Sequence, residues 1–207
     1  MTTTQAPTPE YAAQVLMRVQ VGYAARGVAL SQAALCGAEQ FIAWQHYPKN
    51  DHSDSSTGYG FYYHAHERSE MPASEHGHFH IFRRELDLPE KFIHLIGIAL
   101  DTKGLPVRLF TTNQWVTGES MADAKTVQRC ITDFTIRPKG RMAPISKWIR
   151  AMLTLYAVEI ASLVDERDLI IAGQANSGIK KSIFLEDRSH HCLTTCQINL
   201  IEKISLQ

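Results

Sequence analysis

Four consecutive segments with strand character, between residues 59 and 117, constrain the fold of this chain more than any other feature. The first two, 59–67 and 76–85, are rich in aromatic residues and alternate along their length. The third, 91–100, is apolar at nearly every position, which is typical of a strand covered on both faces. The turn "DTKG" separates it from residues 105–118, so these two segments are predicted to form a hairpin. The sequence therefore predicts a run of antiparallel strands.

Helical patterns precede the strands, in residues 1–47. Thr8 followed by Pro9 is suited to begin a helix, and apolar residues recur at helical spacing up to about Arg26. A second helix is predicted from Ser31. The stretch "YPKNDHSDSSTG" that follows is rich in turn-forming residues, so it is predicted to be a loop.

Helices resume after the strands, in residues 119–165. Residues 144–164 carry a broad apolar stripe of helical period, which is expected to face the core. Residues 166–207 are predicted to form a C-terminal extended segment. Helices, then strands, then helices predict a single α+β domain over residues 1–207, with an antiparallel sheet of four or more strands packed against N-terminal and C-terminal helices.

Composition and charge argue against several classes of protein. Apolar residues make up 44% of the chain and charged residues 20%, as in ordinary globular domains. Lys and Arg together number 21, equal to Asp plus Glu, whereas nucleic-acid-binding proteins usually carry a basic excess. The first ten residues lack the pattern of a secretory signal, and no apolar run approaches the roughly 18 residues of a membrane span. Four scattered cysteines do not suggest a disulfide framework, so the expected location is the cytoplasm.

Alternating histidines are the most unusual local feature of the chain. They are His64 and His66, followed by His76, His78 and His80. Every second residue of a strand projects to the same face, so each run of histidines is expected to share one face. The residues between the two runs are enough for a hairpin loop, and Cβ atoms of paired strands lie about 4.5–5.5 Å apart. Four or five imidazoles are therefore expected to converge on one patch of the sheet.

This convergence predicts a metal site, because neutral imidazole is the commonest metal ligand at pH 7. The predicted ligands are His64, His66, His76, His78, His80 and Glu70, with Glu75 beside them as a catalytic carboxylate. Histidine with carboxylate is compatible with Zn, Fe(II) or Mn. Three protein ligands and an open position would indicate catalysis through a bound water or oxygen.

Two other interpretations of the histidines stay open at this point. They would line a solvated sheet face, or they would form a hydrogen-bonded acid–base cluster without a metal. His94 is interpreted separately: it shares a face with Ile96 and Ile98, which predicts a core histidine rather than a ligand.

Two later regions carry further candidate residues. Polar side chains alternate in residues 105–118, where Asn113 and Trp115 are predicted to line a small-molecule pocket; the alternative is an edge strand with a solvated face. Glu119 is either a second catalytic carboxylate or a helix N-terminal carboxylate. The last group is His190, His191, Cys192 and Cys196. Zinc sites of this type usually need a second Cys pair, so a loop leading into the last strand is the preferred interpretation.

The spacing Gly58-x5-His64-x-His66-x3-Glu70-x6-Gly77 resembles the first motif of the cupin family. This resemblance implies that His64, His66 and Glu70 bind a metal on a small β-barrel. The second cupin motif, with its later ligand histidine, is missing from the sequence, and the long helical segments leave too few strands for such a barrel.

The triplet His78-Phe79-His80 resembles the His-hydrophobic-His motif of rolling-circle nucleases. This resemblance implies a histidine pair on a central antiparallel strand and a helix tyrosine as nucleophile, for which Tyr156 is the candidate. The chain also resembles an uncharacterised bacterial family, a domain of unknown function, through "HERSEMPASEHGHFHIF" and "HLIGIALDTKGLPVRLFTTNQWVTGE". That resemblance covers most of the chain after residue 58 and carries no established activity.

These features together predict a metal-binding protein, and more specifically a metal-dependent oxygenase or hydrolase that acts on a small organic molecule. The alternatives are a non-catalytic metal-binding or ligand-binding protein and a DNA-nicking enzyme. A small-molecule ligand is the expected partner, whereas the balanced charge argues against nucleic acid and the absence of a long apolar run argues against a membrane.

Overall fold

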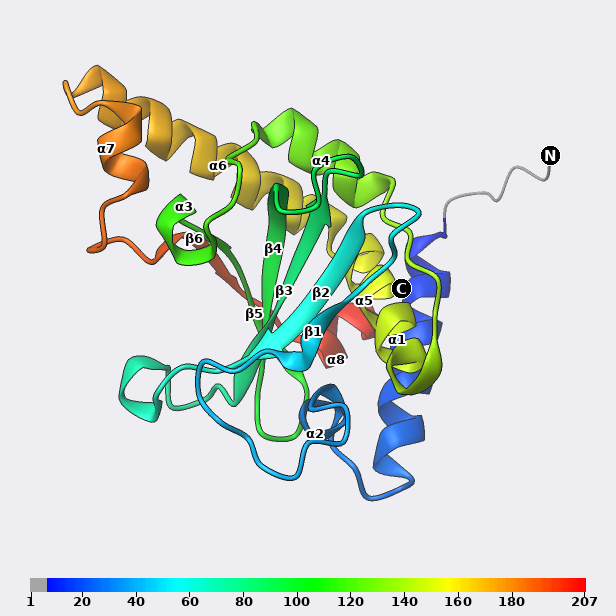
Figure 1. The fold of residues 1–207 in the computed structure, drawn as a ribbon. Helices are drawn as coiled ribbons and strands as arrows, with labels where there is room; N and C mark the ends of the chain where they lie inside the picture. The colour runs from blue at the N-terminus through cyan, green and yellow to red at the C-terminus, as the bar shows by residue number, and fades with distance from the viewer. Residues whose placement is uncertain (1–6) are drawn as a thin grey trace.

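Six strands form one antiparallel sheet in which each strand pairs with its neighbours in sequence (Figure 1). The computed structural model describes residues 7–207, so most of the segment on which the secretory-signal argument rests lies outside the described residues. The strands are β1 (Tyr47–Ser53), β2 (Tyr59–His64), β3 (Gly77–Arg84), β4 (Phe92–Leu100), β5 (Pro106–Thr112) and β6 (Cys192–Gln197). The sheet and its helices confirm the predicted α+β domain.

Helices stand before, between and after the strands. They are α1 (Pro9–Ala24), α2 (Leu30–Ala34), α3 (Gln114–Thr117), α4 (Ala124–Thr132), α5 (Ala143–Leu155), α6 (Ala157–Asn176), α7 (Lys181–Leu185) and α8 (Leu200–Ser205), with 3-10 turns η1 (Arg68–Glu70) and η2 (Gly140–Met142). Within residues 7–207, no helix combines the length and the apolar character that crossing a membrane requires.

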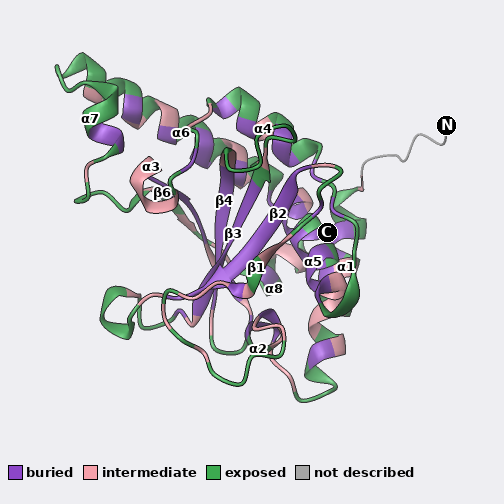
Figure 2. Ribbon diagram, in the orientation of Figure 1, coloured by how far each residue is buried: buried purple, intermediate pink, exposed green. Residues whose placement is uncertain are grey.

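The helices α1, α4, α5 and α6 cover one face of the sheet and enclose the hydrophobic core with it (Figure 1). Trp148 of α5 is fully buried, and its ring lies 5.9 Å from that of Phe79 on β3. Figure 2 shows the central strands buried and the outer sides of the helices exposed. The other face of the sheet carries His64, His78 and His80, and it adjoins a cavity lined by residues of η1, of the loop before β3 and of α3.

The N-terminal region is only partly helical. Thr8 caps α1 as predicted, with its Oγ1 accepting a hydrogen bond from the backbone N–H of Tyr11 at 3.3 Å. The second predicted helix is confined to α2, because the backbone turns to positive φ at Cys36 and Gly37. The predicted loop after it contains β1, which pairs irregularly with β2 and is exposed along much of its length. A polar edge strand of this kind lacks the apolar alternation by which a strand is identified.

The later segments also differ from prediction at their ends. The last predicted strand of the run stops at Thr112, because the Asn113 side chain caps α3 and Gly118 closes that helix at φ 69°. The predicted helix 144–164 is two helices that meet at Tyr156. The extended segment predicted for residues 166–207 is wrong over much of its length, since α6 continues to Asn176 and α7 and α8 follow.

Candidate metal centre

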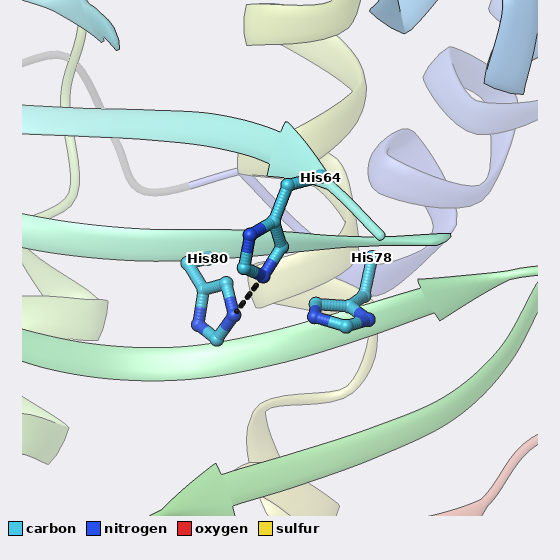
Figure 3. A group of neighbouring side chains, drawn as sticks. All are labelled: His64, His78 and His80. Carbon is cyan, nitrogen blue, oxygen red and sulfur yellow. Dashed lines mark hydrogen bonds between the residues drawn. The ribbon is translucent and has the colours of Figure 1, made fainter. Parts of the chain in front are cut away.

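Three of the predicted histidines come together on the open face of the sheet (Figure 3). Strand β2 carries His64 opposite His78 of β3, and His80 lies two residues further along β3 on the same face. Their exposed fractions are 8%, 5% and 2%, respectively. Each ring offers a nitrogen within 4.8 Å of those of the other two, and in residues 7–207 no other group of three possible ligands lies this close. This histidine triad, His64, His78 and His80, could hold a metal ion.

Hydrogen bonds link the triad to the strands beside it. The Nε2 atoms of His80 and His64 lie 3.1 Å apart. On its other side, His80 Nδ1 lies 2.9 Å from Nε2 of His94, whose Nδ1 is 3.2 Å from Oγ1 of Thr112. The Nδ1 atoms of His64 and His78 are buried and have no hydrogen-bond partner among residues 7–207.

Burial keeps the rings of the triad neutral. It lowers the pKa of His64 to about 3, with the neighbouring His66 and His46 acting in the same direction. Burial also lowers the pKa of His78 and of His80 well below the ordinary value, and nearby imidazoles add to both shifts. At neutral pH the three rings therefore keep lone pairs for a cation and need not first lose a proton.

His94 joins this face because β4 contains a bulge. The register pairs Ile81 with Ile96 but Phe82 with His94, so Leu95 is an extra residue. The prediction that His94 shares a face with Ile96 is therefore wrong, because simple alternation fails across the bulge. The side chain is buried, as predicted, but it bonds to His80 and not to a partner in the apolar core.

His66 lies beside the triad and outside the regular strand. Its ring stacks on Trp44 with centroids 4.2 Å apart, and its centroid lies 5.1 Å from those of His64 and His78. A backbone hydrogen bond from Trp44 N–H to Ala65 oxygen, at 2.7 Å, holds this stack in place. His66 is thus a neighbour of the triad without belonging to the close group.

His76 faces elsewhere. Its Nδ1 lies 2.8 Å from the hydroxyl of Tyr63, and its ring stacks on Phe41 with centroids 4.8 Å apart. The residue precedes β3, which begins at Gly77, so the alternation that predicts a shared face with His78 does not extend to it.

A cavity of about 340 Å³ adjoins the triad. Its lining residues are His66, Glu70, Met71, Pro72, Glu75, His78, His80, Arg108, Phe110, Thr112, Val116, His191 and Cys192. Glu70, one of the predicted ligands, thus lines the cavity but is not among the close group. Glu75 is buried and accepts two hydrogen bonds from Arg108, at 2.6 and 2.9 Å, so its two oxygens are engaged in an ion pair.

The other predicted site residues lie outside this lining. Glu119 is buried at 3% exposure, and its Oε2 accepts a hydrogen bond from the backbone N–H of His94 at 2.9 Å. Burial raises its pKa to about 8. Asn113 donates to the Phe184 oxygen at 2.9 Å, and Trp115 Nε1 donates to the His190 oxygen at 3.0 Å, so both tie α3 to the C-terminal region.

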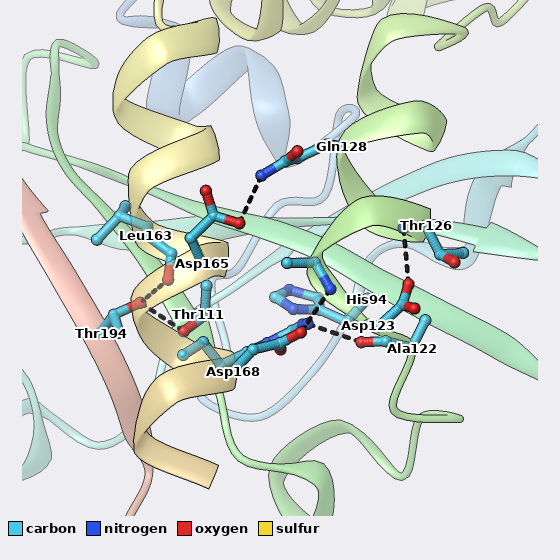
Figure 4. Close-up of polar contacts among 12 residues, drawn as sticks. His94, Thr111, Ala122, Asp123, Thr126, Gln128, Leu163, Asp165, Asp168 and Thr194 are labelled. Carbon is cyan, nitrogen blue, oxygen red and sulfur yellow. Dashed lines mark hydrogen bonds and ion pairs between the residues drawn. The ribbon is translucent and has the colours of Figure 1, made fainter. Parts of the chain in front are cut away.

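A second polar layer lies on the helix side of the sheet, near His94 (Figure 4). Thr111 and Thr194 share a hydrogen bond of 2.7 Å, and Thr194 donates to the Leu163 oxygen of α6 at 3.0 Å. The buried Arg167 donates to Asp168 and to the Ala122 oxygen, each at 2.7 Å. These bonds join β5, β6 and the segment before α4 to α6, so they fix the frame behind the histidines.

Several residues around the triad were not predicted from the sequence. The residues of β5 that face the histidines are Arg108, Phe110 and Thr112. The polar residues that the sequence singles out, Asn113 and Trp115, stand at odd-numbered positions and so do not belong to this set. Tyr62, two positions before His64, stacks on His80 with centroids 5.0 Å apart, and its place in the alternation is a signal that would have identified it. His46 stacks on Tyr62 at 3.7 Å, but it precedes an edge strand that the sequence does not reveal.

The fold and the position of Tyr156 differ from what the cupin and rolling-circle nuclease resemblances imply. The single sheet with helices on one face differs from the small barrel that the cupin resemblance implies. Tyr156 is buried at 2% exposure in the core cluster, across the sheet from His78 and His80, where it is not placed to act as a nucleophile beside them. Of the C-terminal group, His191 and Cys192 line the cavity, whereas Cys196 packs against the core.

Comparison with known proteins identifies the chain at the level of its family. No curated protein and no solved structure matches it. The family model described as "Domain of unknown function (DUF6969)" matches residues 10–198, which includes all six strands and the histidine triad. The chain therefore belongs to this family of unknown function.

Proposed function

We propose that the protein binds one divalent transition-metal ion through His64, His78 and His80 and uses it to transform a small organic molecule. The observation that carries this proposal is the triad itself: three buried, neutral imidazoles, each with a ring nitrogen that lies within 4.8 Å of a ring nitrogen of the other two. Zn, Fe(II) and Mn all accept imidazole ligands.

The buried nitrogens favour a metal over a purely hydrogen-bonded cluster. His78 Nδ1 is buried with no partner among residues 7–207, and an unsatisfied polar group of this kind costs about 1–3 kcal/mol. The His80 and His64 Nε2 atoms point at each other across 3.1 Å, where at most one of two neutral rings has its proton on that side. A cation between the three rings would accept imidazole nitrogen lone pairs for which the protein supplies few hydrogen-bond donors.

The cavity beside the triad favours catalysis over storage of a metal. His78 and His80 line it, so a metal held there would have an open side. Its volume of about 340 Å³ falls at the small end of the usual range of ligand pockets. A metal with three protein ligands and an open position activates a bound water for hydrolysis or binds oxygen, which is the chemistry of a hydrolase or an oxygenase.

A non-catalytic metal protein is the second candidate, and His66 is the residue that favours it. Its ring centroid lies 5.1 Å from those of His64 and His78, so a small movement would make it a fourth ligand that closes the coordination shell. The two functions differ in whether the metal keeps an exchangeable position.

Elemental analysis tests the metal site. The wild-type protein, purified and then reconstituted separately with Zn, Fe(II) and Mn, is expected to hold close to one equivalent of metal, and the His78→Ala/His80→Ala variant none. His190→Ala is the matched control, because His190 is half-exposed and lies outside the cavity lining. A wild type that remains free of metal, or a double variant that keeps it, would show that the triad is not the site.

Azide binding then separates the two candidates. If the Co(II)-loaded protein has an open position, added azide is expected to change its visible absorption spectrum. An unchanged spectrum in the wild type, together with a response in His66→Ala, would show that His66 closes the site and would favour the non-catalytic function.

A further inference from the structure

We propose that His94 is a positioning residue for the metal site, and that it holds His80 in the tautomer that exposes Nε2 to the metal. This inference rests on the proposed function, since it concerns the same site. It extends the functional unit from three histidines on one hairpin to a fourth on β4 and a threonine on β5.

The contacts form a continuous chain. His80 Nδ1 lies 2.9 Å from His94 Nε2, and His94 Nδ1 lies 3.2 Å from Thr112 Oγ1. All three side chains are buried, with exposed fractions of 2–3%. The hydrogen bonds along this chain are therefore made within the protein and not exchanged with bulk water.

The chemistry of neutral imidazole makes this chain directional. Each neutral ring has one N–H, so a His80 that binds metal through Nε2 carries its proton on Nδ1 and donates it to His94 Nε2. His94 then carries its own proton on Nδ1 and donates it to Thr112 Oγ1. If His94 instead donated from Nε2, the proton of His80 would lie on Nε2 and block the lone pair that the metal needs.

The bulge in β4 is the feature that builds this arrangement. Leu95 is the extra residue, so His94 turns toward the histidine face. Glu119 accepts a hydrogen bond from the His94 backbone N–H at 2.9 Å, which holds the backbone at that point. Metal-bound histidines usually donate their second ring N–H to a carboxylate, a backbone carbonyl or a water, and loss of that acceptor costs about 10- to 100-fold in metal affinity. For His80 the acceptor is the Nε2 atom of His94.

Two pairs of variants test the inference by Zn²⁺ affinity. His94→Leu removes the acceptor and is expected to weaken Zn²⁺ binding by about 10- to 100-fold, whereas His94→Gln keeps an acceptor oxygen and is expected to recover much of that loss. Thr112→Val removes the next acceptor and is expected to weaken binding, and Thr112→Ser to restore it. Thermal melting of each variant without metal shows whether it is folded. If His94→Leu does not fold, Thr112→Val, whose side chain has nearly the same shape as threonine, still tests the inference.

Nitrogen-15 NMR of the metal-free wild type supplies a readout that does not depend on metal. The ring of His80 is expected as the Nδ1–H tautomer, and the Nε2–H tautomer would overturn the inference. If the wild type binds Zn²⁺ and the leucine and valine variants bind it equally well, the inference fails alone. If the wild type binds no metal at all, the proposed function fails and the positioning role fails with it.

Discussion

Replacing Glu119 by glutamine is expected to stabilise the protein at neutral pH. Burial raises the pKa of this carboxyl from its ordinary 4.5 to about 8. At pH 7 the folded protein therefore holds the proton, whereas the unfolded chain has lost it. Because the folded-state pKa is raised, the stability contributed by the protonated form is complete below about pH 4.5 and is lost as pH rises through 8.

The magnitude follows from that interval. Between pH 4.5 and pH 7, each pH unit costs about 1.4 kcal/mol, which gives about 3 kcal/mol in total. Glutamine has no proton to lose, and its amide oxygen can still accept the hydrogen bond from the His94 backbone N–H. Glu119→Gln is therefore expected to raise the free energy of unfolding by about 3 kcal/mol at pH 7, but by less than about 1 kcal/mol at pH 5.

Urea unfolding in the presence of a chelator, at pH 5, 6, 7 and 8, measures this difference. Glu90→Gln is the matched control, because Glu90 is exposed and its replacement should change little at any pH. A gain that is the same at pH 5 and pH 7, or a loss of stability at pH 7, would refute the argument. A loss would mean that the folded protein holds Glu119 as a carboxylate.

Three further predictions concern the same face of the sheet. Burial lowers the pKa of His64 and of His94 to about 3, so the stability that these neutral rings contribute is complete above about pH 6.5 and declines toward pH 3. In metal-free Glu119→Gln, urea unfolding should show that the free energy of unfolding falls by about 1.4 kcal/mol per histidine for each pH unit below 6. A flat profile would contradict this. Glu75→Gln leaves the guanidinium of Arg108 without its buried ionised partner, so urea unfolding should show a loss of about 3–5 kcal/mol, most of it recovered when both residues are replaced by methionine. Gly97→Ala places a methyl group against the ring of Phe110 on β5 and is expected to cost about 1–3 kcal/mol; an unchanged melting temperature would show that the ring moves freely aside.

The sheet could be predicted from the sequence because its central strands carry strong local signals. Strands β2 to β5 are rich in aromatic or β-branched residues, and a short turn joins β4 to β5; all four strands are confirmed. The edge strand β1 has no such signal, since much of it is exposed and polar. Helix α6 continues to Asn176, but the charged Arg167 occupies a buried position where the apolar stripe would continue, so the stripe that predicts the helix ends before the helix does.

The candidate site was predictable where the strands are regular. Alternation places His64, His78 and His80 on one face, and the hairpin brings them together. Alternation fails for His94, because a bulge in β4 reverses the phase, and for His76, because the residue precedes its strand. A bulge depends on how two strands fit together, so one strand read alone does not disclose it.

The order of the strands has a consequence for the kinetics of folding. All ligands of the triad lie within residues 64–80, on a single hairpin, and hairpins form within about 1–10 μs. A metal ion would therefore meet its complete ligand set before the C-terminal helices have docked, and its binding energy would already be present in the transition state. If the triad binds metal as proposed, added metal is expected to accelerate refolding and to leave the unfolding rate nearly unchanged.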